Sequence, residues 1–166
     1  VKKIQPINYQ IPSDISSGSF FIALTALSIK SQLIIKNVNV NPTRIGVIKI
    51  LKKMGVKISL HNKKIYKGEQ VADIFVKSPK TLKPINCPPR LNSEAIDEFL
   101  IIFLIAAKAK GISIFKNLNE LNKKLLYLPI PRICKSVCKV IVVRGRQSIK
   151  YLTTVPSNAN PCRCIL

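Results

Sequence analysis

The 166-residue sequence predicts an α/β (α+β) fold with the element order β-α-β-α-β-β. Two patterns indicate this fold. Short runs rich in β-branched residues alternate with longer segments whose apolar residues recur at helical spacing, and Asn, Pro and Gly separate these segments. The start of a second unit follows, and then an irregular C-terminal tail over residues 125–166.

The first predicted elements are a strand and a buried helix. Lys3–Ile11 alternates loosely between apolar and polar residues, which favours a strand with Pro6 at a sheet edge. The helix runs from Asp14 to about Ile29, and either Asp14 or Ser13 can cap it because a short side-chain oxygen accepts first-turn N–H groups. Apolar side chains cover most of its circumference, so we expect burial on several sides. These are Phe20, Phe21, Leu24, Ala26 and Leu27.

Ser16 and Ser17 fall in the first turn of this helix. Unpaired N–H groups and the positive end of the helix dipole favour an anion there, so a phosphate site is one interpretation. The other interpretation is that both serines only begin a core helix, where serine is a common first-turn residue. The local pattern leaves both open.

A short strand and a second helix come next. Gln32–Val38 is a β-rich run. Asn41-Pro42-Thr43 predicts the start of a helix, because Asn is a good cap and Pro fits a first turn, where its missing N–H costs nothing. Gly55 predicts the end of that helix.

Three strand segments are predicted after Gly55. Val56–Leu60 and Lys64–Tyr66 favour a hairpin that turns at His61-Asn62-Lys63, and Ala72–Lys77 favours the next strand. These strands complete the β-α-β-α-β-β order.

A second unit is predicted to begin after an extended, Pro-rich connection over Thr81–Leu91. Asn92 or Ser93 opens a third helix, which we expect to cover Glu94–Gly111. The strand Ile112–Phe115 follows this helix.

The net charge of +21 raises the question of nucleic-acid binding. No nucleic-acid partner is expected, because the lysines are spread along the chain, with no cluster tighter than Lys52-Lys53 or Lys63-Lys64. The sequence has 26 Ile, 22 Lys and 12 Asn, all with A/T-rich codons, so a biased genome explains the charge without a polyanion. Phe99–Ala107 is too short to span a membrane, and no export signal is evident, so a cytoplasmic location is expected.

Four segments carry a family resemblance when they are taken in order. They read DISSGSFF, NPTRIGVIKILKKMGVKI, VADIFV and EAIDEFLIIFLIAAKAKG. Together they resemble EPSP synthases (3-phosphoshikimate 1-carboxyvinyltransferases) over residues 1–124. The resemblance implies transfer of the enolpyruvyl group of phosphoenolpyruvate to the 5-hydroxyl of shikimate 3-phosphate, with no metal or organic cofactor.

The resemblance also implies roles for individual residues. Asp97 matches the aspartate that contacts the reacting hydroxyl and is the candidate proton acceptor, whereas the residues alone also fit an acid that complements a helix dipole. The implied substrate-binding residues are Ser16, Ser17, Phe20, Glu120 and Lys124. Ser16 and Ser17 would lie near the 3-phosphate and Phe20 against the shikimate ring. Glu120 begins a segment similar to the family's ELRVKESDR motif, and Lys124 would be a cation beside the phosphate.

Several departures from the family pattern argue against activity of this chain alone. Glu94 stands where the family has arginine, Leu100 where it has proline, and Leu125 where it has a catalytic glutamate. The lysine and arginines that bind phosphoenolpyruvate are missing. We therefore expect a fragment or degenerate relative that is inactive by itself. The alternatives are part of a split enolpyruvyl transferase with a missing complementary half, or a small basic nucleic-acid-binding module.

The resemblance stops after Lys124. Residues 1–124 contain 50 Ile, Lys or Asn, whereas the 42 residues after Lys124 contain only 10 and no acid. We therefore predict a domain over residues 1–124 and a non-homologous, frameshifted tail over residues 125–166. Four cysteines of the tail offer a zinc site as an alternative, but their CxxxC and CxC spacings do not match the usual CxxC knuckles, so no metal is expected. They are Cys134, Cys138, Cys162 and Cys164.

Overall fold

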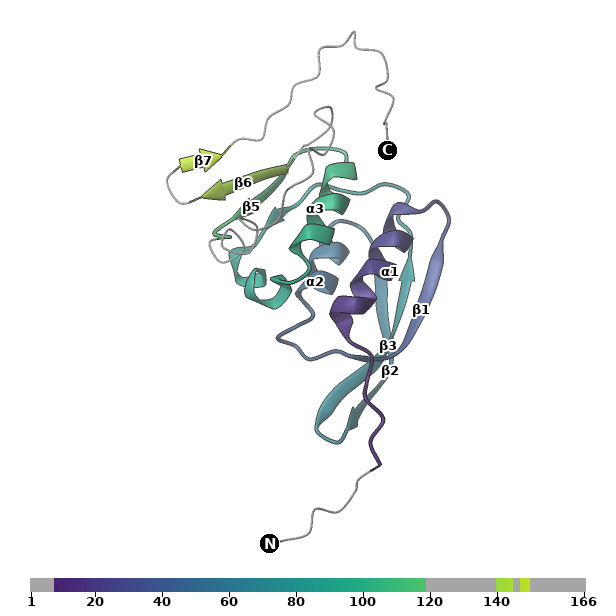
Figure 1. Cartoon of the computed structure of the whole chain (residues 1–166). Coiled ribbons are helices and arrows are strands. Elements are labelled where there is room, and N and C mark those ends of the chain that lie inside the picture. The colour runs from purple at the N-terminus through teal and green to yellow at the C-terminus, as the bar shows by residue number, and fades with distance from the viewer. Residues whose placement is uncertain (1–7, 119–139, 145–146, 150–166) are drawn as a thin grey trace, which may run out of the picture.

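The computed structural model describes residues 8–118, 140–144 and 147–149 (Figure 1). Within these residues the chain forms two sheets, and its three α-helices lie between them. This arrangement confirms the predicted mixed α/β fold.

The first sheet is antiparallel and has the strand order β1-β3-β2. Its strands are β1 (Gln32–Asn39), β2 (Lys57–Tyr66) and β3 (Glu69–Lys77). Ile74 and Val76 of β3 are fully buried, whereas the alternate residues Asp73 and Phe75 are partly exposed. One face of the sheet therefore packs on the helices, as the two-residue period of a half-buried strand requires.

The predicted hairpin turn at His61-Asn62-Lys63 is wrong, because these residues lie inside the continuous strand β2. The pairing with β3 shifts register there, and Asn62 adopts a φ of 50°. Asp73 explains the irregularity: one of its carboxylate oxygens accepts from Asn62 Nδ2 at 2.7 Å, and the other from the Asn37 backbone at a matching bulge in β1. The hairpin turns later, at Lys67-Gly68, both with positive φ.

The predicted strand over Lys3–Ile11 is wrong in its described part, since residues 8–12 form no strand. Only Ser13 makes a bridge, to Val38 of β1. Side chains hold the preceding segment instead, with the Gln10 amide donating to the Tyr66 hydroxyl at 3.2 Å. Pro12 lacks the N–H that a ladder needs.

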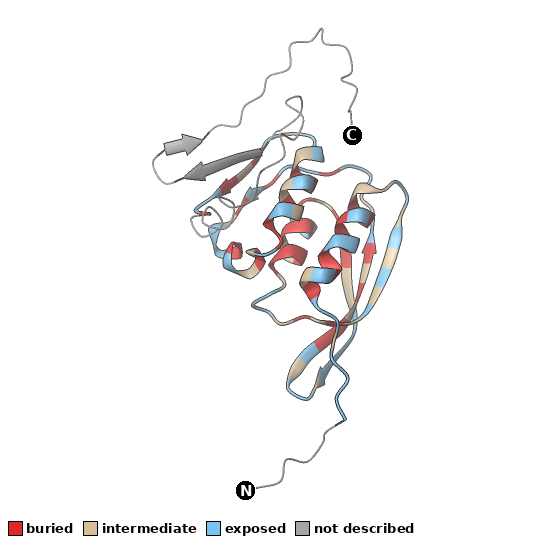
Figure 2. Ribbon diagram, in the orientation of Figure 1, coloured by how far each residue is buried: buried red, intermediate tan, exposed pale blue. Residues whose placement is uncertain are grey.

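The helix α1 (Ile15–Leu27) confirms the first predicted helix, but not its burial. Phe20, Phe21 and Leu24 are 66%, 60% and 65% exposed, while Ile22, Ala23 and Ala26 face the core (Figure 2). The predicted burial of α1 on several sides is therefore wrong, although apolar residues cover most of its circumference. Within the described residues, they leave an uncovered apolar face on the side away from the first sheet.

The helix α2 (Gly46–Lys53) begins later than predicted. Asn41 Oδ1 accepts from the backbone and hydroxyl of Thr43 at 3.0 and 2.9 Å, and the Arg44 amide donates to the Asn41 carbonyl. Asn41 thus forms a turn ahead of the helix rather than its cap. Gly55, with a φ of 94°, ends the helical segment as expected.

The second sheet has the order β4-β5-β6-β7. Its strands are β4 (Asn86–Cys87), β5 (Ser113–Lys116), β6 (Val140–Arg144) and β7 (Gln147–Ile149). The expected irregular tail therefore contributes two short strands. β4 and a 3-10 turn (Pro89–Leu91) interrupt the expected extended connection.

The helix α3 (Phe99–Lys108) connects β4 to β5, and it starts later than predicted. A 3-10 turn (Ser93–Ala95) and three turn residues precede it. Phe99, Phe103 and Phe115 pack together, with ring centroids 5.1 to 5.9 Å apart. No helix in the described part of the chain is long and apolar enough to cross a membrane.

Candidate functional site

The N-terminal end of α1 is capped by Asp14. Its Oδ2 accepts from the Ser17 backbone N–H at 2.9 Å and from the Ser17 hydroxyl at 3.2 Å. These hydrogen bonds, the backbone one first, hold the pKa of the Asp14 carboxyl below its usual range. The structure therefore confirms Asp14 as the cap, and it places a carboxylate where the sequence left room for a bound anion.

Ser16 joins α1 to the segment that leads into α3. Its hydroxyl donates to Glu98 Oε1 at 2.5 Å, and its oxygen accepts from Arg44 Nη2 at 3.5 Å. Arg44 Nη2 also lies 3.8 Å from Asp97 Oδ2. We call these four residues the Ser16–Glu98 cluster: Ser16, Arg44, Asp97 and Glu98.

Local structure explains how residues 82 positions apart in the sequence meet in this cluster. The turn at Asn41 directs Arg44 towards α1, and the turn before α3 brings Asp97 and Glu98 to the start of that helix. Next to the cluster, Lys49 of α2 pairs with Glu94 at 2.5 Å. Glu94 therefore has a structural contact in this chain.

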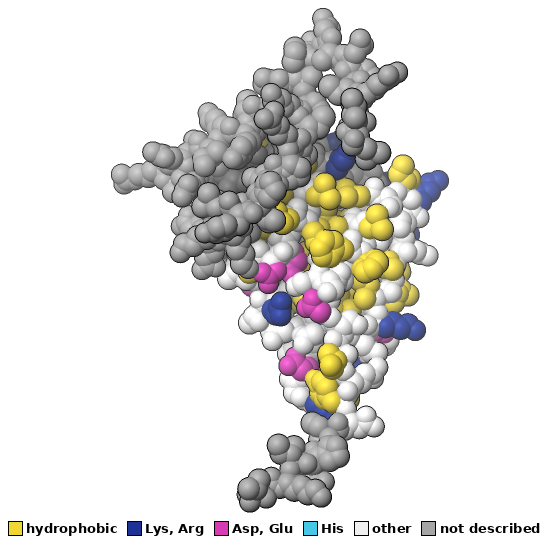
Figure 3. All heavy atoms as spheres, viewed as in Figure 1, with side chains coloured by type: hydrophobic (Ala, Val, Ile, Leu, Met, Phe, Trp, Pro, Cys, Tyr) yellow, Lys and Arg dark blue, Asp and Glu magenta, His cyan; other side chains and the backbone are white. Residues whose placement is uncertain are grey.

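The cluster is acidic overall. Asp97 lies beside the guanidinium of Arg44, and the same charge acts on Glu98 and on Asp14, the cap of α1. In the space-filling view acidic side chains gather beside basic ones below the apolar surface of α1 and α3 (Figure 3). Arg44 and Asp97 have side chains 56% and 47% exposed, so both are accessible to a ligand.

Glu98 differs from Asp97 because it is only 4% exposed. Burial raises the pKa of the Glu98 carboxyl, and the nearby charge of Asp97 acts in the same direction. The hydrogen bond from Ser16 opposes the rise but does not cancel it. A buried acid with a raised pKa beside an exposed one is a common arrangement in functional sites.

Phe20 lies one helical turn after Ser16, so the two residues share a face of α1. Its exposed ring can contact a ligand held at Ser16. The structure thus brings together Ser16, Ser17 and Asp97, with Phe20 one turn away. The other two predicted binding residues, Glu120 and Lys124, lie outside the described residues, as do the cysteines of the tail.

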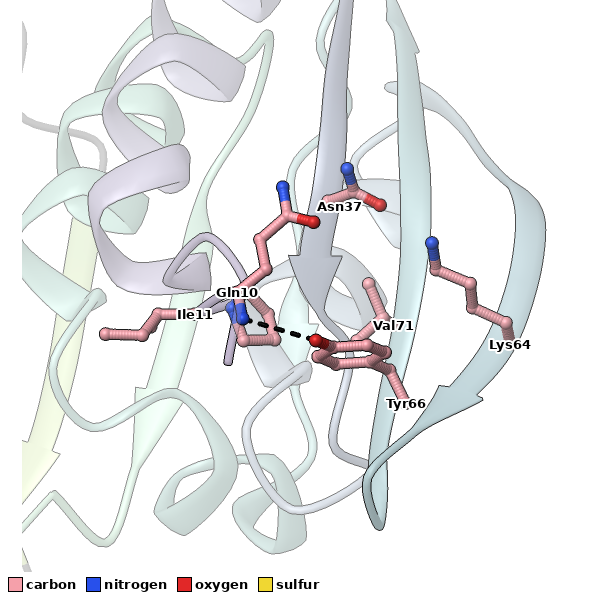
Figure 4. Close-up of a pocket in the computed structure, with 7 residues that line it drawn as sticks. Gln10, Ile11, Asn37, Lys64, Tyr66 and Val71 are labelled. Carbon is pink, nitrogen blue, oxygen red and sulfur yellow. Dashed lines mark hydrogen bonds between the residues drawn. The ribbon is translucent and has the colours of Figure 1, made fainter. Parts of the chain in front are cut away.

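A metal site is not apparent in the described part of the chain, where no three His, Cys, Asp or Glu side chains gather. A shallow pocket lies elsewhere, between the segment before α1 and the first sheet (Figure 4). Gln10, Asn37, Lys64 and Tyr66 are among its lining residues. It shares no residue with the Ser16–Glu98 cluster.

The match to a family model settles the family of this chain. Residues 1–126 match the model for EPSP synthase (3-phosphoshikimate 1-carboxyvinyltransferase). The chain belongs to the EPSP synthase family.

Individual members of the family are closely similar to the chain. It is 46% identical over 122 residues to the 3-phosphoshikimate 1-carboxyvinyltransferase of Hydrogenovibrio crunogenus. This matched region covers 74% of the chain and 27% of that protein. The same enzyme of Ruthia magnifica is 47% identical over 115 residues, with 69% and 26% covered.

Solved structures agree with this assignment. An EPSP synthase structure from Acinetobacter baumannii superposes with a TM-score of 0.66 at 43% identity, covering 68% of the chain and 25% of that protein. The chain therefore spans about a quarter of the length of the curated relatives it matches.

Sequence reasoning missed two members of the cluster, Arg44 and Glu98. Arg44 lies within the NPTR segment that carries the family resemblance, so the sequence did contain a signal for this residue. Glu98 follows Asp97 directly, and only the fold shows that one of these acids is buried and the other exposed.

Proposed function

We propose that this chain forms the shikimate 3-phosphate side of an EPSP synthase active site. In that reaction the enolpyruvyl group of phosphoenolpyruvate is transferred to shikimate 3-phosphate. The observation that carries the proposal is the meeting of Ser16, Arg44 and Asp97 at the N-terminal ends of α1 and α3. Family membership supplies the substrate class.

Each residue has a role that its chemistry allows. Arg44 supplies a guanidinium for the phosphate, the Ser16 hydroxyl adds a hydrogen bond to it, and Ser17 lies next to Ser16 in the first turn of α1. Phe20 contacts the shikimate ring. Asp97 accepts the proton of the 5-hydroxyl as its oxygen attacks the enolpyruvyl carbon, because an accessible carboxylate within hydrogen-bond reach both orients and deprotonates a hydroxyl.

We also propose that the chain does not turn over by itself. Among the described residues, Arg44 is the one cation that acts on Asp14, Asp97 and Glu98 together, and this charge balance does not favour two phosphorylated substrates. Phosphoenolpyruvate carries a phosphate and a carboxylate, so its site needs several more cations. We expect those cations in the part of the relatives' length that this chain does not span, whereas Lys124 would contact shikimate 3-phosphate. We also propose that the chain is cytoplasmic. A complementary half that completes the active site is a further part of this proposal.

The residues after Lys124 are proposed to be unrelated to the family. The abrupt change in composition supports this, and so does the end of the family match at residue 126. Sequencing the DNA across codon 125 tests it. A VKESDR-like continuation in another frame is expected, and its absence from every frame would contradict a frameshift.

Phosphate release tests the proposed lack of turnover. The purified chain is incubated with phosphoenolpyruvate and shikimate 3-phosphate, and inorganic phosphate is measured against the Asp97→Ala variant. We expect both proteins to give the same background. Release by the natural sequence that Asp97→Ala abolishes would show that the chain is active alone.

A further inference from the structure

The hydroxyl proton of Ser16 is already engaged in this structure. A serine hydroxyl has one proton to donate, and that of Ser16 goes to Glu98 Oε1 at 2.5 Å. The Ser16 oxygen accepts from Arg44, and the Ser17 hydroxyl donates to Asp14. Neither hydroxyl therefore has a proton available for a ligand while Glu98 and Asp14 are ionised.

A phosphate ester offers this site only acceptor oxygens at neutral pH, where it is mostly a dianion. It needs donors, and it is repelled by nearby carboxylates. Ionised Glu98 thus opposes binding in two ways, since it holds the Ser16 proton and adds a negative charge. Neutral Glu98 removes both obstacles.

We propose that Glu98 is a positioning residue that takes up one proton from solvent when a phosphate ester binds, and thereby turns the Ser16 hydroxyl towards the ligand. The inference rests on the proposed function, because the ligand is shikimate 3-phosphate. In the bound state the Glu98 O–H donates to Ser16 Oγ, and the Ser16 O–H donates to the phosphate. No covalent bond of the ligand changes.

The described charged groups around Glu98 favour this protonation. Asp97 lies beside it on the segment leading into α3, and Lys49 of α2 is neutralised by Glu94. Burial raises the pKa of Glu98 most and Asp97 adds to the rise, whereas the hydrogen bond from Ser16 and, to a smaller extent, the charge of Arg44 lower it. A bound dianion adds negative charge and raises the pKa further.

Titration calorimetry with shikimate 3-phosphate measures the proton directly. Binding is followed at one pH near 8, where the ligand is fully dianionic, in two buffers of different ionisation enthalpy. The natural sequence is expected to take up protons on binding, to a limit of one per site. Its affinity should fall with rising pH by up to about tenfold per unit.

The Glu98→Gln variant separates positioning from a structural role. Its amide donates to Ser16 as the neutral acid does, so it should bind at least as tightly at pH 8, with no proton uptake and no pH dependence. Glu98→Ala, which leaves Ser16 without this partner, should bind more weakly. Glu69→Gln is the matched control, because Glu69 accepts a hydrogen bond from Asn39 in the first sheet rather than from Ser16, and this variant should keep the proton uptake.

The possible outcomes are distinct. If the natural sequence binds with the same proton count as Glu98→Gln, or if Glu98→Gln weakens binding as Glu98→Ala does, this inference is overturned and the proposed function stands. If neither the natural sequence nor Glu98→Gln binds shikimate 3-phosphate, the proposed function fails and the inference fails with it.

Discussion

Asp14 holds the start of α1 through its two hydrogen bonds with Ser17. Replacing it with alanine should lower the free energy of unfolding by about 1 kcal/mol at pH 7, since the first turn loses its cap. Asp14→Ser keeps an uncharged cap and should recover most of this loss. Chemical denaturation of the three proteins measures both effects, and equal stability of Asp14→Ala and the natural sequence would contradict the assignment.

The same carboxyl gives a pH signature. Its pKa is lowered in the folded state, so its stabilisation is present above the ordinary value of about 3.9 and is lost as the pH falls through the lowered pKa. The stability difference between the natural sequence and Asp14→Ser should therefore shrink as the pH drops from about 5 towards 2. A difference that stays constant over this range would show that the charge of Asp14 contributes nothing.

Cys87 of β4 is buried at 1% exposure, and burial raises the pKa of its thiol to about 11. At pH 7 only about one thiol in ten thousand is then ionised. In a variant with the other four cysteines changed to serine, Cys87 should react with a thiol reagent only after denaturant is added. Rapid labelling of the folded protein would contradict its burial.

Single residues show where sequence reasoning was sufficient. The cap at Asp14 was predictable, because it depends on neighbours three positions away. Arg44 and Glu98 were missed, because their contacts with Ser16 cross 28 and 82 positions and exist only in the folded chain.

At the scale of elements, Gly46 fixes how α2 meets the turn before α3. A Cβ at this position would lie 2.6 Å from the Glu94 carbonyl carbon and 2.8 Å from the Ala95 nitrogen. Gly46→Ala should therefore destabilise the fold by about 1–3 kcal/mol, despite the better helix propensity of alanine, because backbone atoms have to move.

Gly18 in α1 is the matched control for this prediction. Its added Cβ would meet only Ile35 Cδ1 at 3.6 Å, an ordinary contact. Gly18→Ala should then stabilise the protein by about 0.5–1 kcal/mol through helix propensity. Thermal unfolding of both variants tests the pair, and effects of the same sign would contradict the packing described for α2.

Helices and strands were predictable in kind but not always in extent. The sequence pattern located α1, β1 and β5 closely, because the cap at Asp14 marks the start of the helix and short apolar, β-rich runs mark both strands. It misplaced the hairpin turn because Asn62 looked like a turn residue, whereas Asp73 on β3 holds it in a bulge. It also began α2 and α3 too early, since local turns precede both helices.

At the scale of the whole molecule, α1 and α3 lie side by side and present an apolar surface (Figure 3). On these helices Leu24, Leu100 and Leu104 are 65%, 50% and 49% exposed. Exposed apolar surface of this kind promotes association. The double variant Leu24→Gln/Leu104→Gln should reduce self-association in sedimentation velocity without lowering the melting temperature.

Ile65→Gln on β2 is the control for this effect, because Ile65 is highly exposed but lies on a strand away from both helices. It should leave the association unchanged. Equal effects of the two changes would mean that general surface hydrophobicity, rather than the α1–α3 surface, controls association.

Binding of shikimate 3-phosphate is the central claim, and a backbone amide NMR titration tests it most directly. Addition of shikimate 3-phosphate should shift the amides of Ser16, Ser17, Arg44 and Asp97 in a saturable way. Shikimate without the phosphate should bind at least about tenfold more weakly, because the contact with Arg44 is lost. Arg44→Gln should remove the preference. Absence of saturable shifts, or shifts confined to the pocket at Gln10 and Tyr66, would contradict the account.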